Sequence, residues 1–203
     1  MTAFGALFDR VRETSPLVHC ISNLVSANDC ANIVLAAGAS PIMADDPEEV
    51  EEITALSRAL CLSLGTPNHR KAEAMVKAGR TAARLGLPVV FDPVGVGASQ
   101  FRQSIAAEVL REVPVTVLRC NASELQALSG LAQVSRGVDA GKTLPPEALR
   151  PLAEQFAAQH HCVAAVTGAE DIVTDGKTTH ILRNGTPLLR RVTGAGCMLS
   201  VLT

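Results

Sequence analysis

Short apolar runs alternate with longer mixed stretches along most of the chain. The runs have the length and composition of buried strands, and they cover 16–22, 40–44, 59–64, 88–92, 115–120 and 162–167. The intervening stretches have helical periodicity or helix-end signals, such as Gly38 and Gly86 as stops and Pro47 near a start. They predict helices over 26–38, 46–57, 68–86, 99–113 and 121–130. Strands that alternate with helices predict an α/β fold, with a mostly parallel sheet covered on both faces.

Residues 171–192, "DIVTDGKTTHILRNGTPLLRRV", interrupt this alternation. The pairs Asp175-Gly176 and Asn184-Gly185 are typical of tight hairpin turns. We therefore expect a short antiparallel hairpin near 170–190, at an edge of the sheet. Residues 131–146 are the least regular stretch, and no repeat or linker divides the chain, so residues 1–203 are predicted to form a single domain.

Composition narrows the possible partners. A formal net charge of −2 provides no basic surface for nucleic acid or an anionic membrane, and the aromatic residues are limited to five Phe. The six cysteines form no C-x-x-C pair, which excludes the common zinc spacings and favours a reducing cytoplasm. The sequence shows neither a signal peptide nor an apolar stretch of transmembrane length.

Polar and glycine-rich motifs follow the predicted strands. In an open α/β sheet, ligands bind beyond the carboxyl ends of the strands, so these motifs should meet at one edge. They are Asn23, Asp45 with Asp46, "GTP" at 65–67, "DPVGVGAS" at 92–99, "NASE" at 121–124 and "TGAED" at 167–171. Their agreement across the strands indicates a binding site more strongly than any one motif does.

The carboxylates of Asp92 and Glu124 are candidate metal ligands. Asp92 at the end of its strand has the chemistry of a Mg²⁺ ligand, although the motif taken alone favours a tight strand-to-helix turn with Asp92 as a helix cap. Arg119 ends the next strand, where it could contact phosphate. Asn121 and Glu124 have the spacing of a capping box, and Glu124 could instead order the shell of a Mg²⁺ ion. The residues alone leave these alternatives open.

The segment "VTGAGC" at 192–197 predicts an anion-binding turn. Backbone N–H groups of Gly194, Ala195 and Gly196 would point at one anion, aided by the dipole of a helix that begins there. The motif lacks the Lys-Ser/Thr ending of a Walker loop and the third glycine of a dinucleotide fingerprint. Cys197 follows at the helix N-terminus. His19, inside a strand, is interpreted as a packed core residue rather than a ligand.

Taken in order, these motifs resemble one family. "SPLVHCISNLV", "ASPIMA", "DPVGVGAS", "RCNASE", "GVDAG", "AVTGAED" and "VTGAGC" occur in the same order in the hydroxyethylthiazole kinases, which belong to the ribokinase-like superfamily. The resemblance extends from about residue 15 to the last residue. It implies a three-layer α/β/α fold and ATP-dependent phosphorylation of the primary alcohol of 4-methyl-5-(2-hydroxyethyl)thiazole, in thiamin salvage.

The resemblance also implies roles for individual residues. Asn23, Val25, Met43 and Gly194 would contact the thiazole substrate. Gly194, Ala195 and Gly196 would form the anion hole. Cys197 stands where most ribokinase-like enzymes have the aspartate that accepts the alcohol proton, and thiazole kinases often have cysteine there.

The nucleotide side is implied in the same way. Arg119 and Thr167 resemble the contacts to the ATP phosphates, with Asn121 beside them. Asp92 and Glu124 resemble the acidic pair that organises Mg²⁺. Cys120 departs from the family pattern, since a glycine is expected before Asn121, and it is predicted to crowd the nucleotide loop slightly.

The family resemblance further implies a homotrimer with the thiazole site shared between neighbouring subunits. Relatives continue past "GAGC" with several helices, so the C-terminal helices are expected to be missing from residues 1–203. Two alternatives stay open at this point. One is a truncated homologue that keeps the trimeric scaffold without turnover. The other is a ribokinase-like ATP-dependent dehydratase of hydrated nicotinamide nucleotides, although that family normally keeps aspartate at the position of Cys197.

Overall fold

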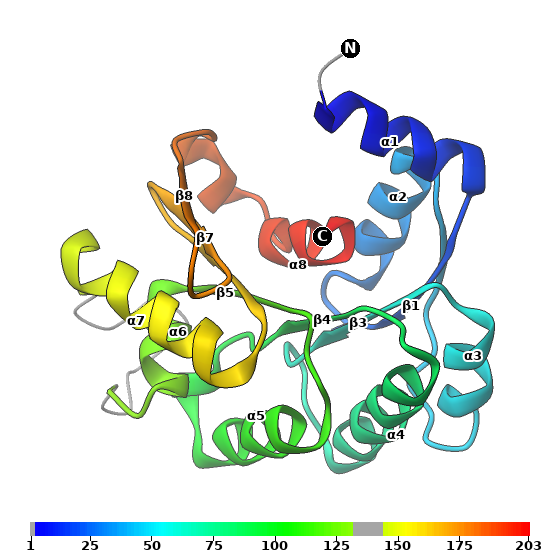
Figure 1. Cartoon of the computed structure of the whole chain (residues 1–203). Helices are drawn as coiled ribbons and strands as arrows, with labels where there is room; N and C mark the ends of the chain where they lie inside the picture. The colour runs from blue at the N-terminus through cyan, green and yellow to red at the C-terminus, as the bar shows by residue number, and fades with distance from the viewer. Residues whose placement is uncertain (1–2, 132–143) are drawn as a thin grey trace.

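The computed structural model describes residues 3–131 and 144–203. The "GVDAG" motif and most of the irregular stretch predicted at 131–146 lie outside the described residues. One eight-stranded sheet runs through the molecule, in the order β2-β1-β3-β4-β5-β6-β7-β8 (Figure 1). The strands are β1 (Leu17–Ile21), β2 (Ser40–Ile42), β3 (Ala59–Ser63), β4 (Val89–Asp92), β5 (Val117–Asn121), β6 (Val163–Thr167), β7 (Asp171–Thr174) and β8 (Thr179–Leu182).

The strands β2, β1, β3, β4, β5 and β6 are parallel neighbours in this order. Each was predicted as an apolar run, and each ends within two residues of its predicted bounds. The central strands β3 and β4 are buried almost throughout because helices cover both of their faces. The predicted three-layer α/β/α fold with a mostly parallel sheet is therefore confirmed.

The helices connect and flank the strands. They are α1 (Ala3–Thr14), α2 (Ala27–Ala37), α3 (Val50–Leu56), α4 (His69–Leu85), α5 (Gln100–Glu112), α6 (Ala122–Leu128), α7 (Pro146–His160) and α8 (Ala195–Leu202), with short 3₁₀ turns η1 (Val96–Ala98) and η2 (Pro187–Arg191). The five predicted helices are present as α2 to α6. The predicted start at 46 was wrong, because the Asp46 side chain accepts the Glu48 N–H and forms a turn before α3 begins. Helices α1 and α7 were not predicted.

The antiparallel hairpin lies at the sheet edge, as expected. β6 pairs with β7 and β7 with β8 in antiparallel fashion. Asp175 closes the β7–β8 turn by accepting the N–H groups of Lys177 and Thr178. The second predicted turn was wrong. Asn184-Gly185 leads into η2 instead, because Thr186 caps that 3₁₀ turn and Pro187 follows it.

The sheet separates two clusters of buried side chains. The larger one lies under α4, α5, α6 and α7 and contains Phe91 and Leu118. The smaller one lies under α1, α2 and α8 and contains Val90 and Cys61. Figure 1 shows these helices on opposite sides of the sheet, with α8 lying above β4. Because side chains alternate along a strand, Asp92 and Arg119 point to the α8 side. None of the helices in the described ranges has the length and apolarity needed to cross a bilayer.

Candidate active site

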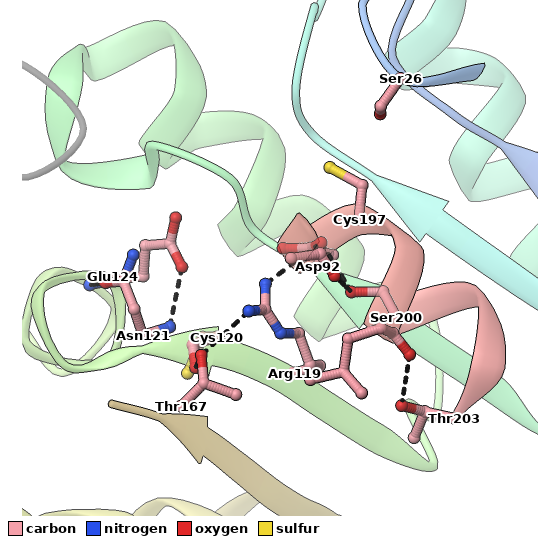
Figure 2. Close-up of polar contacts among 12 residues, drawn as sticks. Ser26, Asp92, Arg119, Cys120, Asn121, Glu124, Thr167, Cys197, Ser200 and Thr203 are labelled. Atoms are coloured by element: carbon pink, nitrogen blue, oxygen red, sulfur yellow. Dashed lines mark hydrogen bonds and ion pairs between the residues drawn. The ribbon is translucent and has the colours of Figure 1, made fainter. Parts of the chain in front are cut away.

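A layer of polar side chains lies beneath α8 and includes Asp92, Arg119 and Thr167. Asp92 lies at the centre of this polar layer. Its side chain is fully buried, and its Oδ2 accepts a hydrogen bond from the Ser200 hydroxyl at 2.7 Å and faces Nη1 of Arg119 at 3.6 Å (Figure 2). Within the described part of the chain, Oδ1 has no hydrogen-bond partner. Burial raises the pKa of Asp92, and the charge of Arg119 and the Ser200 hydrogen bond act in the opposite direction. A buried carboxylate with one free oxygen is well suited to hold a cation.

Arg119 extends the polar layer toward β6. Its Nη2 donates to the Thr167 hydroxyl at 2.9 Å, and that hydroxyl lies 3.3 Å from the carbonyl oxygen of Cys120. The other side of the guanidinium lies against the glycine turn, since a Cβ at Gly196 would be 2.6 Å from Nη1. The structure thus brings together Asp92, Arg119, Thr167 and the glycine turn, which the sequence had predicted separately.

Glu124 forms a second buried carboxylate that joins two loops. Its Oε2 accepts the N–H of Asn121 at 2.9 Å, and its Oε1 accepts the N–H of Gly95 at 2.8 Å. Burial and the charge of Asp92 raise its pKa to about 7, against these two backbone hydrogen bonds. Asn121 accepts the Glu124 N–H in return, so the predicted capping box is present.

The glycine turn leads from the 3₁₀ turn η2 into the predicted helix, α8. Gly194 has φ +77°, and a Cβ there would lie 2.7 Å from the Cβ of Ser26 on the neighbouring segment. Within the described residues, the N–H groups of Gly194 and Gly196 have no hydrogen-bond acceptor, whereas Ala195 N–H makes a long 3.4 Å bond to the Val192 carbonyl. Two of the three predicted donors therefore point away from the protein's own acceptors.

Asn23 holds Cys197 beside this turn. Its Nδ2 donates to the Cys197 sulfur at 3.1 Å, and its Oδ1 accepts the N–H groups of Val25 and Ser26, each at 3.0 Å. Three hydrogen bonds fix the orientation of the amide. The amide in turn fixes the thiol, which is partly exposed at the start of α8. Two residues predicted for catalysis and substrate binding are thus in direct contact.

Val25 and Met43 lie beyond the ends of β1 and β2, at one side of the sheet. These two apolar residues are 66% and 38% exposed. Nearby, the Lys71 ammonium is buried and donates to the Ser22 carbonyl at 2.7 Å, with Asp45 at 3.5 Å. Lys71 therefore joins the segments that follow β1 and β2.

Cys120 does not lie in the nucleotide loop as its sequence position predicts. Its side chain points away from Arg119 into the larger core cluster and is completely buried there. The alternation of β5 places Cys120 and Arg119 on opposite faces, so the predicted crowding was wrong.

The interpretation of His19 is confirmed. It is fully buried, with Nδ1 2.9 Å from the Thr54 hydroxyl and Nε2 2.8 Å from the Ala44 carbonyl.

Three site residues were missed by sequence reasoning. Ser200 binds Asp92, Ser26 packs against Gly194, and Arg102 joins two strand-end loops. Ser200 was detectable in principle, because it follows Cys197 by three residues and so shares its helix face. Nothing in the sequence marked Ser26 or Arg102, since their contacts come from distant segments.

The two carboxylates fit a Mg²⁺ site. Within the described residues, Asp92 offers a buried oxygen without a partner, and its charge contributes to the raised pKa of Glu124. No group of three metal-ligating side chains occurs in the described ranges. Mg²⁺ commonly binds one or two carboxylates and completes its shell with water and substrate phosphates. The donor set therefore suits an ion that arrives with a nucleotide.

Comparison with known proteins supports this interpretation. A family model described as "HK: Hydroxyethylthiazole kinase family" matches residues 8–203. The hydroxyethylthiazole kinase of Clostridium beijerinckii is 49% identical over 98% of this chain and 73% of its own length. That of Haemophilus influenzae is 46% identical over 95% and 73%. The solved hydroxyethylthiazole kinase of Pyrococcus horikoshii has a TM-score of 0.86 and 41% identity, covering 97% of this chain and 73% of that one.

More distant structures share the fold alone. One is the pyridoxal kinase of Staphylococcus aureus, with a TM-score of 0.59 and 14% identity. Fold and site together define a ribokinase-like α/β kinase, in which a glycine turn at a helix start faces a buried arginine and carboxylate. The family match and the identities then decide the particular kind: the chain belongs to the hydroxyethylthiazole kinase family.

Proposed function

We propose that this chain transfers the γ-phosphoryl group of ATP to the primary alcohol of 4-methyl-5-(2-hydroxyethyl)thiazole, a reaction of thiamin salvage. Membership in the hydroxyethylthiazole kinase family supports the reaction class. The observation that carries the proposal is the contact between Asn23 and Cys197 at the start of α8, beside Gly194. This contact places the Cys197 thiol, which would face the alcohol substrate, beside the proposed anion-binding turn. The family match favours this reaction over a dehydratase of hydrated nicotinamide nucleotides.

Phosphoryl transfer depends on positioning and on stabilisation of negative charge. In our proposal, the free N–H groups of the 194–196 turn face the oxygens of the transferred group, and Arg119 with Thr167 contacts the ATP phosphates. Asn121 lies beside them, at the cap of α6. These donors are fixed before substrate binds, because Asp92, Thr167 and Gly196 hold the guanidinium in place. Preorganised donors in a buried layer stabilise developing charge effectively.

Cys197 would lie against the alcohol that attacks the phosphorus. The Asn23 amide fixes its sulfur, so the side chain can orient the hydroxyl and, as a thiolate, accept its proton to become the thiol while the new O–P bond forms and ADP leaves. A thiol suits this role less well than a carboxylate, and its contribution is partly positional. Asn23, Val25 and Met43 would contact the thiazole ring.

Asp92 and Glu124 would hold Mg²⁺, which neutralises phosphate charge when it is bound. We further propose a homotrimer in which the exposed apolar residues Val25 and Met43 lie at the subunit boundary, and a cytoplasmic location. The exposure of the Val25 and Met43 side chains supports the homotrimer. Sedimentation velocity of the purified protein tests the trimeric state, and a monomer at micromolar concentration would contradict the proposed homotrimer.

An ADP-release assay tests the reaction. With ATP and Mg²⁺, release should depend on added thiazole alcohol, and EDTA should abolish it. Asn23→Ala removes the amide that holds Cys197 and should lower kcat, while the exposed Arg84→Ala leaves it unchanged. ADP release that is independent of the alcohol would contradict the proposal.

A further inference from the structure

Arg102 is a half-buried cation that no part of the proposed reaction uses. Its guanidinium donates to three backbone carbonyls: Nη1 to Leu64 and Val94, each at 2.7 Å, and Nη2 to Gly65 at 2.9 Å. Leu64 and Gly65 follow β3, and Val94 follows β4. One side chain therefore joins the loops at the carboxyl ends of two adjacent strands.

The loop after β3 leads to the acceptor side of the site. Gly65 packs directly on Asn23, since a Cβ at Gly65 would overlap the Asn23 side chain. In the same loop, the Thr66 hydroxyl accepts the Leu24 N–H at 3.1 Å. Because Asn23 holds Cys197, a displacement of this loop would move the thiol.

The loop after β4 leads to the carboxylate side. Val94 precedes Gly95, whose N–H is donated to Glu124. Asp92 begins the same loop and carries the free oxygen of the polar layer. A displacement of this loop would therefore change the separation between the two buried carboxylates.

The geometry of Arg102 is specific to a planar guanidinium. Ser99 caps α5 by accepting the Arg102 N–H at 3.2 Å, which fixes the start of the side chain. Donors on both terminal nitrogens then reach carbonyls from two loops, a fork that a lysine ammonium does not reproduce. The position also has an energetic cost, because burial lowers the pKa of Arg102 while the Glu124 charge raises it.

We propose that Arg102 is a positioning residue that sets the separation between the Asn23–Cys197 side and the Asp92–Glu124 side of the kinase site. Arg102 acts through the two loops and is not placed against substrate. The proposal rests on the proposed function for its catalytic consequence, whereas the clamp itself can be measured without turnover.

The test compares Arg102→Lys and Arg102→Met with wild type in the intact protein. A 1 Å displacement of reacting groups can cost about 100-fold in rate, so both variants should lose about 10- to 100-fold in kcat. Equal losses of kcat in Arg102→Lys and Arg102→Met would show that the planar guanidinium geometry matters more than the positive charge. Millimolar guanidinium chloride should partly restore kcat to Arg102→Ala, and methylammonium should not.

Amide hydrogen exchange provides the second readout. The N–H groups of Leu24 and Gly95 should exchange about tenfold faster or more in Arg102→Met, because each loop loses a charge-assisted hydrogen bond. Arg80→Met is the matched control. It removes an exposed ion pair to Glu112 on the neighbouring helix and should change neither exchange nor kcat.

Wild-type exchange in both loops of Arg102→Met would overturn the proposal, even if kcat fell. Full kcat in that variant would overturn it as well. If wild type did not phosphorylate the alcohol, the proposed function would fail. The exchange measurement would then decide alone whether Arg102 clamps the two loops.

Discussion

Gly194→Ala adds one methyl group at the position where α8 meets the segment before α2. Two effects oppose the added Cβ. The backbone at Gly194 has φ +77°, a left-handed conformation that costs a side-chain-bearing residue about 1–2 kcal/mol. The new Cβ would also lie 2.7 Å from the Ser26 Cβ, against about 3.5–4.0 Å for an ordinary carbon contact.

The contact can be relieved by a movement of about 1 Å, which changes the position of the start of α8 relative to Arg119. Overpacking of this kind costs about 1–3 kcal/mol, so the free energy of unfolding should fall by about 2–5 kcal/mol in total. The same movement displaces the 194–196 donors and Cys197. We therefore expect kcat to fall about 100-fold.

Gly86→Ala separates the two effects. Gly86 also has positive φ, +66°, but a Cβ there meets nothing within 4 Å. It should lower stability by about 1–2 kcal/mol and leave kcat unchanged. The double variant Gly194→Ala with Ser26→Gly removes the opposing Cβ and should recover much of the lost activity. Ser26 makes no side-chain cap bond to α2 and accepts only a long 3.8 Å contact from the Cys30 thiol, so its own replacement should cost about 1 kcal/mol.

Urea unfolding and the ADP-release assay measure these quantities on the same preparations. The reasoning is refuted if Gly194→Ala is as active and as stable as Gly86→Ala. It is also refuted if Ser26→Gly fails to improve the Gly194→Ala protein.

Three further predictions concern single side chains. Cys197→Asp keeps the Asn23 contact with a group that is already deprotonated at neutral pH and should retain or raise kcat, whereas Cys197→Ala should lower it at least tenfold in the same assay. In metal-free protein, the raised pKa of Glu124 means that the native state binds its proton more tightly than the unfolded chain. Unfolding titrations should therefore show stability falling as pH rises from about 4.5 to about 7, by at most about 3 kcal/mol, and Glu124→Gln should flatten this dependence. Lys71→Met removes the link between Ser22 and Asp45. In initial-rate measurements it should raise KM for the alcohol severalfold and leave KM for ATP unchanged. Equal changes in both KM values would contradict this role of Lys71.

The parallel sheet was predictable because its strands are buried on both faces. Continuous apolar runs such as 59–64 and 88–92 leave few alternatives to a central strand. The helix α1 gave a weaker signal, since its surface residues Leu7 and Phe8 are exposed apolar side chains that blur the amphipathic pattern. In α7, Pro151 lies inside the helix and interrupts its local signal.

The site was predictable where its residues follow strands. Asp92 and Thr167 end parallel strands, Asn23 follows one, and Arg119 lies two residues before the end of β5, so topology brings them to one edge. The partners that orient them were not predictable. Ser26 and Ser200 lie at or within helices, and their importance arises only when α2 and α8 pack on the sheet.

The hairpin region illustrates the same limit. Asp175-Gly176 forms a turn because two strands of the right length flank it. Asn184-Gly185 has the same local chemistry, but no second strand follows it, and Pro187 cannot donate to a ladder. Local turn signals therefore identify a possible hairpin, and the flanking residues decide whether it forms.

Transfer of labelled phosphate tests the central claim most directly. The purified protein is incubated with γ-labelled ATP, Mg²⁺ and 4-methyl-5-(2-hydroxyethyl)thiazole, and the product is identified by mass spectrometry, with Gly194→Ala alongside. We predict label on the hydroxyethyl oxygen with wild type and about 100-fold slower labelling with the variant. Label released only as inorganic phosphate, or equal labelling by both proteins, would contradict the account.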